Sequence, residues 1–165
     1  MILITGGMKS GKSTFALNMA LKYTKRAFLA TGVPFDEEMR LRIEKHKAER
    51  KELFDTFEEP VNVTEVLKNI DNNYDVILFE CLTTYLGNLY YYQLDVQERI
   101  DGLVDVLSNM SSDVIVVTNE VGWGIIPENP IARQYAEMLG KTNTRLAKLA
   151  KEVYLVVSGI GVRIK

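Results

Sequence analysis

The sequence of 165 residues has one cysteine, Cys81, one histidine, His46, and only four prolines. One cysteine excludes an intrachain disulfide framework and any zinc or iron–sulfur site built on several cysteines, which favours a reducing compartment such as the cytoplasm. No repeat, low-complexity tract or flexible linker divides the chain. We therefore expect one domain over residues 1–165, long enough to bury a core without disulfides or metal.

A large excess of charge of either sign is also lacking. The 20 lysines and arginines nearly balance the 22 acidic residues, for a formal net charge of −2. This balance provides no basic field for nucleic acid or an anionic membrane. No uncharged apolar run approaches the roughly 18 residues of a membrane span, and the first residues do not read as a secretory signal. We expect a soluble cytoplasmic protein without a nucleic-acid partner.

Short apolar runs rich in β-branched residues alternate with stretches of helical spacing. The expected strands are Met1–Thr5, Ala27–Thr31, Val76–Phe79, Val114–Thr118 and Val153–Ser158. The expected helices are Lys12–Tyr23, Asp36–Lys51, Val63–Ile70, Leu82–Tyr92, Val96–Met110 and Ile131–Lys151. This alternation predicts an α/β fold, a mostly parallel sheet with helices on both faces. Phe54–Pro60 is either a short strand or an extended loop, and Val162–Lys165 is expected to be an edge strand.

The segment between the first strand and the first helix matches the phosphate-loop pattern G-x-x-x-x-G-K-[ST]. Its residues are Gly6, Gly7, Met8, Lys9, Ser10, Gly11, Lys12 and Ser13. In such a loop, backbone N–H groups and the N-terminus of the helix point at phosphate oxygens. Lys12 would then bridge the β- and γ-phosphates, and Ser13 would ligate Mg²⁺. The sequence therefore predicts a site for a nucleoside triphosphate.

A phosphate loop usually works with an acidic residue at the end of a neighbouring strand. Two carboxylates follow apolar strands in this way, Glu80 and Glu120. Both would lie on the same edge of a parallel sheet as the phosphate loop. We expect Glu80 to hold the metal, while the structural alternative for either residue is to cap the next helix.

The only histidine lies in a highly charged predicted helix, Asp36–Lys51, which begins acidic and ends basic. Arg42 lies one turn before His46, and Arg50 lies one turn after it. The two positive charges disfavour protonation of the imidazole and leave a neutral nitrogen available as a nucleophile. A lone histidine on a charged helix is, however, more often a solvated surface residue. The residues by themselves leave both interpretations open.

Together these motifs resemble the bifunctional adenosylcobinamide kinase/adenosylcobinamide-phosphate guanylyltransferase family of cobalamin assembly. The resemblance lies in ILITGGMKSGKS, in Arg42-Ile43 before His46-Lys47 and Arg50, and in LFECLTTYLGN, TNEVGWGIIPENPIAR and LVVSGIGVRIK. These segments span nearly the whole chain. The resemblance implies a RecA-like variant of the P-loop fold and a homotrimer. It also implies phosphorylation of adenosylcobinamide with ATP or GTP, followed by GMP transfer from GTP to adenosylcobinamide phosphate.

The same resemblance implies the roles of individual residues. His46 would carry GMP as a guanylyl-histidine, while Lys12 and Glu80 complete the catalytic set. Ser13 and Glu80 would hold Mg²⁺. Beyond the phosphate loop, the implied nucleotide contacts are Thr31, Gly32, Val33, Arg50, Lys51, Glu52, Leu53, Glu58 and Glu80.

Two alternative functions share the phosphate loop. A small-molecule kinase without nucleotidyl transfer would leave His46 unused, and covalent labelling by GTP with Mg²⁺ would separate the two cases. A RecA-like nucleotide switch would be stimulated by a macromolecule, which the balanced charge disfavours. The aromatic run Tyr85–Tyr92 and the lone Trp123 are interpreted either as core packing or as a subunit or corrinoid contact.

Overall fold

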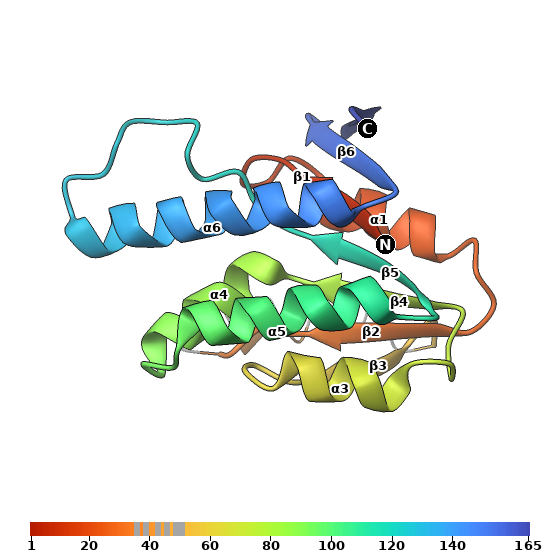
Figure 1. Ribbon diagram of the computed structural model, residues 1–165. Helices are drawn as coiled ribbons and strands as arrows, with labels where there is room; N and C mark the ends of the chain where they lie inside the picture. The colour runs from red at the N-terminus through yellow and green to blue at the C-terminus, as the bar shows by residue number, and fades with distance from the viewer. Residues whose placement is uncertain (35–36, 38–39, 42–43, 45–46, 48–51) are drawn as a thin grey trace.

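The chain is organised around a seven-stranded sheet with the strand order β3-β2-β4-β5-β1-β6-β7 (Figure 1). The computed structural model describes residues 1–34, 37, 40–41, 44, 47 and 52–165. The strands are β1 (Ile2–Thr5), β2 (Arg26–Ala30), β3 (Asp55–Glu58), β4 (Val76–Glu80), β5 (Asp113–Val117), β6 (Glu152–Val157) and β7 (Ile160–Arg163). All neighbouring strands pair in parallel except β6 and β7, which are antiparallel.

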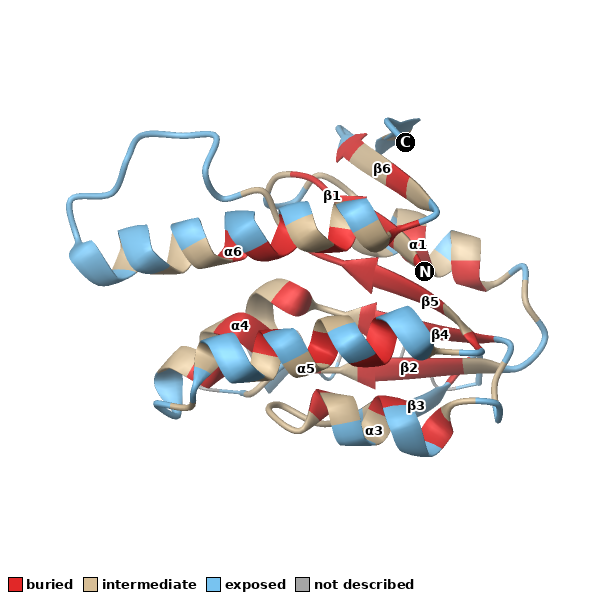
Figure 2. Ribbon diagram, viewed as in Figure 1, coloured by how far each residue is buried: buried red, intermediate tan, exposed pale blue. Residues whose placement is uncertain are grey.

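Helices cover both faces of this sheet. They are α1 (Lys12–Ala20), α3 (Val63–Ile70), α4 (Leu82–Tyr91), α5 (Val96–Asn109) and α6 (Pro130–Leu149). Alternate strand residues face opposite sides, so Leu3 packs in the cluster with α3 to α6, whereas Ile4 packs in the cluster with α1. The central strands are the most thoroughly buried part of the molecule (Figure 2). The predicted α/β fold is therefore confirmed, with the RecA-like feature of a phosphate loop after β1 inside a mostly parallel sheet.

The structure also corrects several predicted boundaries. The first helix ends at Ala20 instead of Tyr23, because the chain already turns toward β2, where Arg26 donates a hydrogen bond of 2.7 Å to the Tyr23 carbonyl. The uncertain segment at 54–60 contains the parallel edge strand β3. The last strand begins at Ile160, two residues before the predicted Val162, directly after the turn at 158–159.

Other predicted features divide between core and surface. Within the aromatic run, Tyr85, Leu86 and Leu89 are buried, whereas Tyr91 and Tyr92 are exposed. Trp123 lies exposed in the connection between β5 and α6. Most of the predicted helix Asp36–Lys51 lies outside the described residues. Throughout the part of the chain that the structure describes, no helix is both long and apolar enough to cross a membrane.

Candidate active site

The phosphate loop is packed tightly against the turn between β6 and β7. Gly6 and Gly11 have positive φ angles of 153° and 95°. A Cβ atom on Gly6 would lie 2.3 Å from the Val156 carbonyl oxygen, and one on Gly11 would lie 2.9 Å from Gly159 Cα. The Gly159 N–H also donates a hydrogen bond of 2.8 Å to the Ser10 carbonyl. Both loop positions therefore need glycine for space as well as for backbone conformation.

Lys12, the first residue of α1, folds back over this loop. Its Nζ donates a hydrogen bond of 2.6 Å to the Gly7 carbonyl and lies 3.5 Å from Ser10 Oγ. The residue is only 7% exposed. Burial lowers the pKa of the Lys12 ammonium group, and the neighbouring Cys81 and Glu80 oppose that shift. The loop thus holds a buried cation where the phosphates of a nucleotide would bind.

Ser13 and Glu80 form a direct pair beside this lysine. Ser13 Oγ donates a hydrogen bond to Glu80 Oε1, which projects from the end of β4. A hydroxyl and a carboxylate are oxygen ligands of the kind that Mg²⁺ prefers. Among the described residues, no group of three or more His, Cys, Asp or Glu side chains could enclose a metal. The pair therefore fits a magnesium ion that takes its other ligands from nucleotide phosphates and water.

The predicted nucleotide-contact turn at 31–33 lies at the same edge of the sheet. The Thr31 N–H donates 3.1 Å to the Glu80 carbonyl, and the Cys81 N–H donates 3.0 Å to Thr31 Oγ1. Asn88 of α4 donates 2.8 Å to the Thr31 carbonyl from a buried position. Burial raises the pKa of the Cys81 thiol, whose sulfur caps α4. The turn is thereby fixed to the junction that presents Glu80.

The second strand-end acid, Glu120, has a different environment. Its Oε1 accepts hydrogen bonds of 2.7 Å from Thr5 Oγ1 and 3.2 Å from Asn143 Nδ2. Its backbone N–H donates 3.1 Å to the Gly6 carbonyl at the start of the phosphate loop. Glu120 therefore joins β1, α6 and the loop, whereas the serine of the loop pairs with Glu80.

Asn143 is a residue of the site that the sequence analysis did not identify. It lies buried on α6, accepts 2.8 Å from Thr118 Oγ1, and donates 3.0 Å to the Asn119 carbonyl. These bonds fix the segment after β5 that ends in Glu120. A polar residue on the apolar face of an amphipathic helix is the only sequence signal that could have indicated it.

Comparison with known proteins decides what this geometry belongs to. The sequence matches, over residues 2–164, the family described as cobinamide kinase / cobinamide phosphate guanyltransferase. The chain belongs to this family. It is 38% identical to the bifunctional adenosylcobalamin biosynthesis protein CobU of Escherichia coli (strain K12), covering 100% of this chain and 99% of that protein. It is 32% identical to the bifunctional adenosylcobalamin biosynthesis protein CobP of Pseudomonas aeruginosa (strain PAO1), covering 99% and 96%.

Solved structures similar to this cobinamide kinase / cobinamide phosphate guanyltransferase family member have much lower sequence identity. The RadB recombinase is 17% identical, with a TM-score of 0.46, and the match covers 93% of this chain and 73% of that one. A KaiC-like protein, PH0186 of Pyrococcus horikoshii OT3, is 16% identical, with a TM-score of 0.49, and the match covers 93% and 70%.

The structure does not bring every contact implied by the family resemblance to the phosphate loop. Glu52 and Leu53 precede β3, and the Leu53 carbonyl accepts 2.8 Å from Arg26 Nε at the start of β2. Because β2 and β3 are parallel, this position is the amino edge of the sheet, whereas the phosphate loop lies at the carboxyl edge. Glu58, the last residue of β3, does lie at the carboxyl edge and forms an ion pair of 2.5 Å with Lys47.

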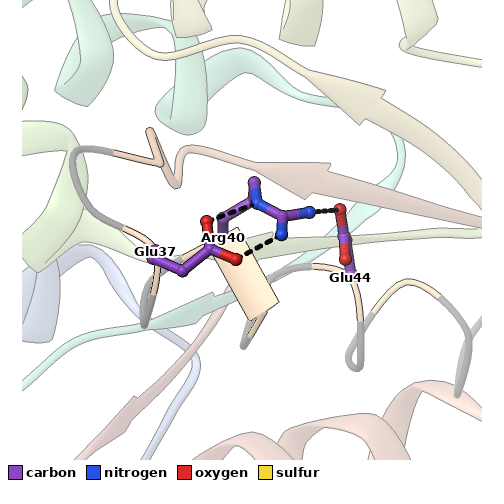
Figure 3. Close-up of polar contacts among 3 residues, drawn as sticks. All are labelled: Glu37, Arg40 and Glu44. Carbon is purple, nitrogen blue, oxygen red and sulfur yellow. Dashed lines mark hydrogen bonds and ion pairs between the residues drawn. The ribbon is translucent and has the colours of Figure 1, made fainter.

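The remaining residues of the histidine segment divide into two groups. His46, Arg42, Arg50 and Lys51 lie outside the described residues. Of the described residues, Arg40 donates to Glu37 and, over 2.6 Å, to Glu44, as Figure 3 shows. These exposed pairs at helical spacing contribute a few tenths of a kcal/mol each and mark a solvated helix face.

Proposed function

We propose that this chain catalyses both reactions in the name of its family. It phosphorylates the aminopropanol hydroxyl of adenosylcobinamide with ATP or GTP, and it then transfers GMP from GTP to adenosylcobinamide phosphate. The observation that carries the proposal is Lys12 folded over the phosphate loop beside the Ser13–Glu80 pair, in a chain that matches the family over residues 2–164. The curated relatives named as bifunctional enzymes support the second activity.

In the kinase step, the substrate hydroxyl oxygen attacks the γ-phosphorus and the bond to the β–γ bridging oxygen breaks. Loop N–H groups and Lys12 hold the β- and γ-phosphates and stabilise the charge that develops on them. Ser13 and Glu80 would hold Mg²⁺, which neutralises part of the same charge. With Glu80 committed to the metal, Glu120 is the remaining strand-end carboxylate. Its Oε2 receives no hydrogen bond from the described residues and can accept the hydroxyl proton.

In the transfer step, a neutral nitrogen of His46 attacks the α-phosphorus of GTP, and pyrophosphate leaves as the bond to the α–β bridging oxygen breaks. A phosphate oxygen of adenosylcobinamide phosphate then attacks the same phosphorus, the P–N bond breaks, and the histidine is regenerated. Two displacements avoid aligning two bulky polyanions in one step. The assignment of His46 rests on the sequence.

Labelling with radioactive GTP tests this division of work. Wild-type protein with Mg²⁺ should retain ³²P from α-labelled GTP and none from γ-labelled GTP. The label should be acid-labile and base-stable, as a phosphoramidate is. His46→Ala should lose the label and the formation of adenosylcobinamide-GDP, while its kinase activity with ATP largely survives. A His46→Ala protein that still makes adenosylcobinamide-GDP would demonstrate direct transfer, and a wild-type protein with kinase activity alone would support the small-molecule kinase.

We also propose a homotrimer located in the cytoplasm. The family resemblance supports the trimer, and the single cysteine supports a reducing compartment. Light scattering on the purified protein should give a mass about three times that of the 18.7 kDa chain. A monomeric mass at micromolar concentration would contradict the trimer.

A further inference from the structure

A largely apolar groove of ≈ 520 Å³ lies between α4, the first turns of α6 and the connection from β5 to α6. Its lining includes Gly87, Tyr90, Val121, Pro127, Ile131 and Tyr135. In Figure 1 the amino-terminal part of α6 extends beside α4, with the β5–α6 connection rising from the same end. The volume lies in the range typical of small-molecule sites, which are also mostly apolar.

The groove is continuous with the candidate active site. Val121 directly follows Glu120, whose backbone and carboxylate are bound to the phosphate loop and to Thr5. Thr83 of α4 joins the two regions. Its Oγ1 accepts 2.9 Å from the Asn119 N–H, and its carbonyl accepts 2.8 Å from the Tyr135 hydroxyl. A ligand in the groove would therefore reach the edge of the sheet where the γ-phosphate would bind.

The floor of the groove contains a glycine inside a helix. Gly87 lies within α4, and a Cβ atom there would meet no atom of the described chain within 4 Å. Glycine in a helix interior costs about 0.5–1 kcal/mol relative to alanine. The rings of Tyr90 and Tyr135 lie beside this space, with centroids 5.9 Å apart and planes inclined at 64°. The helix thus leaves room next to two aromatic faces, at a cost in its own stability.

The connection that borders the groove is strongly apolar and open to solvent. Trp123 is 67% exposed and Ile125 is 97% exposed. Neighbouring Ile126 and Ile131 are exposed as well. Contiguous apolar surface of this kind usually marks a binding site. Asn129 adds a polar group, because its Oδ1 caps α6 through Ile131 and Ala132 and leaves the amide Nδ2 for a ligand carbonyl.

We propose that this groove binds the corrin macrocycle of the cobinamide substrate, with the aminopropanol hydroxyl directed toward the phosphate loop. The inference rests on the proposed function and names the surface that serves it. A broad macrocycle with methyl groups and peripheral amides matches two tyrosine rings, aliphatic side chains and one free amide donor. Continuity with Glu120 and the phosphate loop favours the substrate over a second copy of the chain, because an acceptor has to lie beside the γ-phosphate.

Filling the space beside Gly87 tests the proposal with little risk to folding. Gly87→Leu places a side chain in the groove and replaces a poor helix former with a good one. The matched control is Gly102→Leu, because Gly102 lies inside α5, away from the groove, and a Cβ there also meets no described atom within 4 Å. Cobinamide binding is measured by equilibrium dialysis, read by the visible absorbance of the corrinoid. Steady-state kinase kinetics are measured on the same proteins.

We expect Gly87→Leu to raise the Kd for cobinamide and its KM at least about tenfold, with the KM for ATP and the Tm maintained. Gly102→Leu should match the wild type in all four quantities. Quenching of the only tryptophan, Trp123, by cobinamide should be strong in the wild type and weak in Gly87→Leu. Loss of binding in both variants to the same extent would contradict a role for the groove.

Two other results would overturn the inference in distinguishable ways. Normal cobinamide binding and turnover by Gly87→Leu, with or without a change in the mass of the assembly, would exclude the groove as the corrin site. A changed mass would in addition identify it as a contact between copies of the chain. A wild-type protein that neither binds nor phosphorylates cobinamide would instead overturn the proposed function, and the groove assignment with it.

Discussion

Ser13 and Glu80 are 67 residues apart in the sequence and are joined by a hydrogen bond at the carboxyl edge of the sheet. The serine is held by the helix that follows the phosphate loop, and the glutamate by a central strand. Because β5 lies between β1 and β4, the contact crosses a neighbouring strand and depends on the whole sheet. This relationship is the basis for assigning Mg²⁺ to these two oxygens.

The first prediction concerns the charge at this pair. Glu80→Gln retains the shape of the side chain and removes its charge, so kinase turnover should fall by roughly 10²-fold, and the Mg²⁺ concentration for half-maximal activity should rise. Metal titration of steady-state kinase activity provides the measurement. Glu120→Gln is the control and should keep the Mg²⁺ dependence of the wild type. If Glu120→Gln alone changes the Mg²⁺ dependence, the metal belongs to the other acid.

The second prediction concerns the cation over the phosphate loop. Lys12→Ala removes the charge that bridges the β- and γ-phosphates, so kinase activity should fall by at least about 10²-fold and triphosphate binding should weaken. The far-ultraviolet circular dichroism should stay unchanged, because the lysine caps no strand or helix. Kinase turnover within about threefold of the wild type would contradict the role of the phosphate loop.

The third prediction separates the two glycines at the start of the loop. Gly6→Ala forces a Cβ atom to within 2.3 Å of the Val156 carbonyl at a positive φ, so it should lower the free energy of unfolding by about 1–3 kcal/mol. Gly7→Ala is the matched control, because its Cβ meets no described atom within 4 Å. Urea unfolding compares the two. Equal stabilities would show that the loop moves away from β6 without cost.

The fourth prediction tests Glu120 as the proton acceptor of the kinase step. The oxygen of a glutamine can still accept hydrogen bonds from Thr5 and Asn143, so Glu120→Gln should fold normally. Its kcat should fall by roughly 10²–10⁴-fold with little change in the KM for ATP. A base must be deprotonated, so wild-type kcat should fall as the pH is lowered, and the variant should lose this acidic limb. Unchanged kcat with an altered KM for ATP would indicate a purely structural role beside the loop.

The fifth prediction concerns a hydroxyl in the core. Tyr85 is fully buried, and its hydroxyl has no hydrogen-bond partner among the described residues. Tyr85→Phe should therefore raise the free energy of unfolding by about 1 kcal/mol at pH 7. Thermal unfolding monitored by circular dichroism measures the change. A loss of stability greater than 1 kcal/mol would show that the hydroxyl is satisfied by an internal water molecule.

The pH dependence of the same variant has a definite sign. Burial raises the pKa of Tyr85 from 10.0 to about 12 in the folded protein. The unfolded state therefore releases this proton first, and stability is lost as the pH rises from about 10 through 12. Tyr85→Phe should lose less stability than the wild type across that interval.

The local sequence determined the elements of this protein and the identity of its phosphate loop. Short apolar runs and helical spacing predicted six of the seven strands and all five named helices within a few residues, because both patterns depend on near neighbours in the chain. The loop was readable because its glycines, lysine and serine act through local backbone geometry. The least certain element was β3, whose four residues are mostly exposed at the edge of the sheet and carry a weak hydrophobic signal.

Only the tertiary structure decided how the distant parts of the site combine. Two equivalent strand-end acids were visible in the sequence, but the packing of α1 against the sheet pairs Ser13 with Glu80, and a buried Asn143 from α6 binds Glu120 instead. The parallel direction of β3 sends Leu53 to the amino edge and Glu58 to the carboxyl edge, although they are five positions apart. Pairing across the sheet depends on strand order and direction, which are set by burial of the whole core and not by any local pattern.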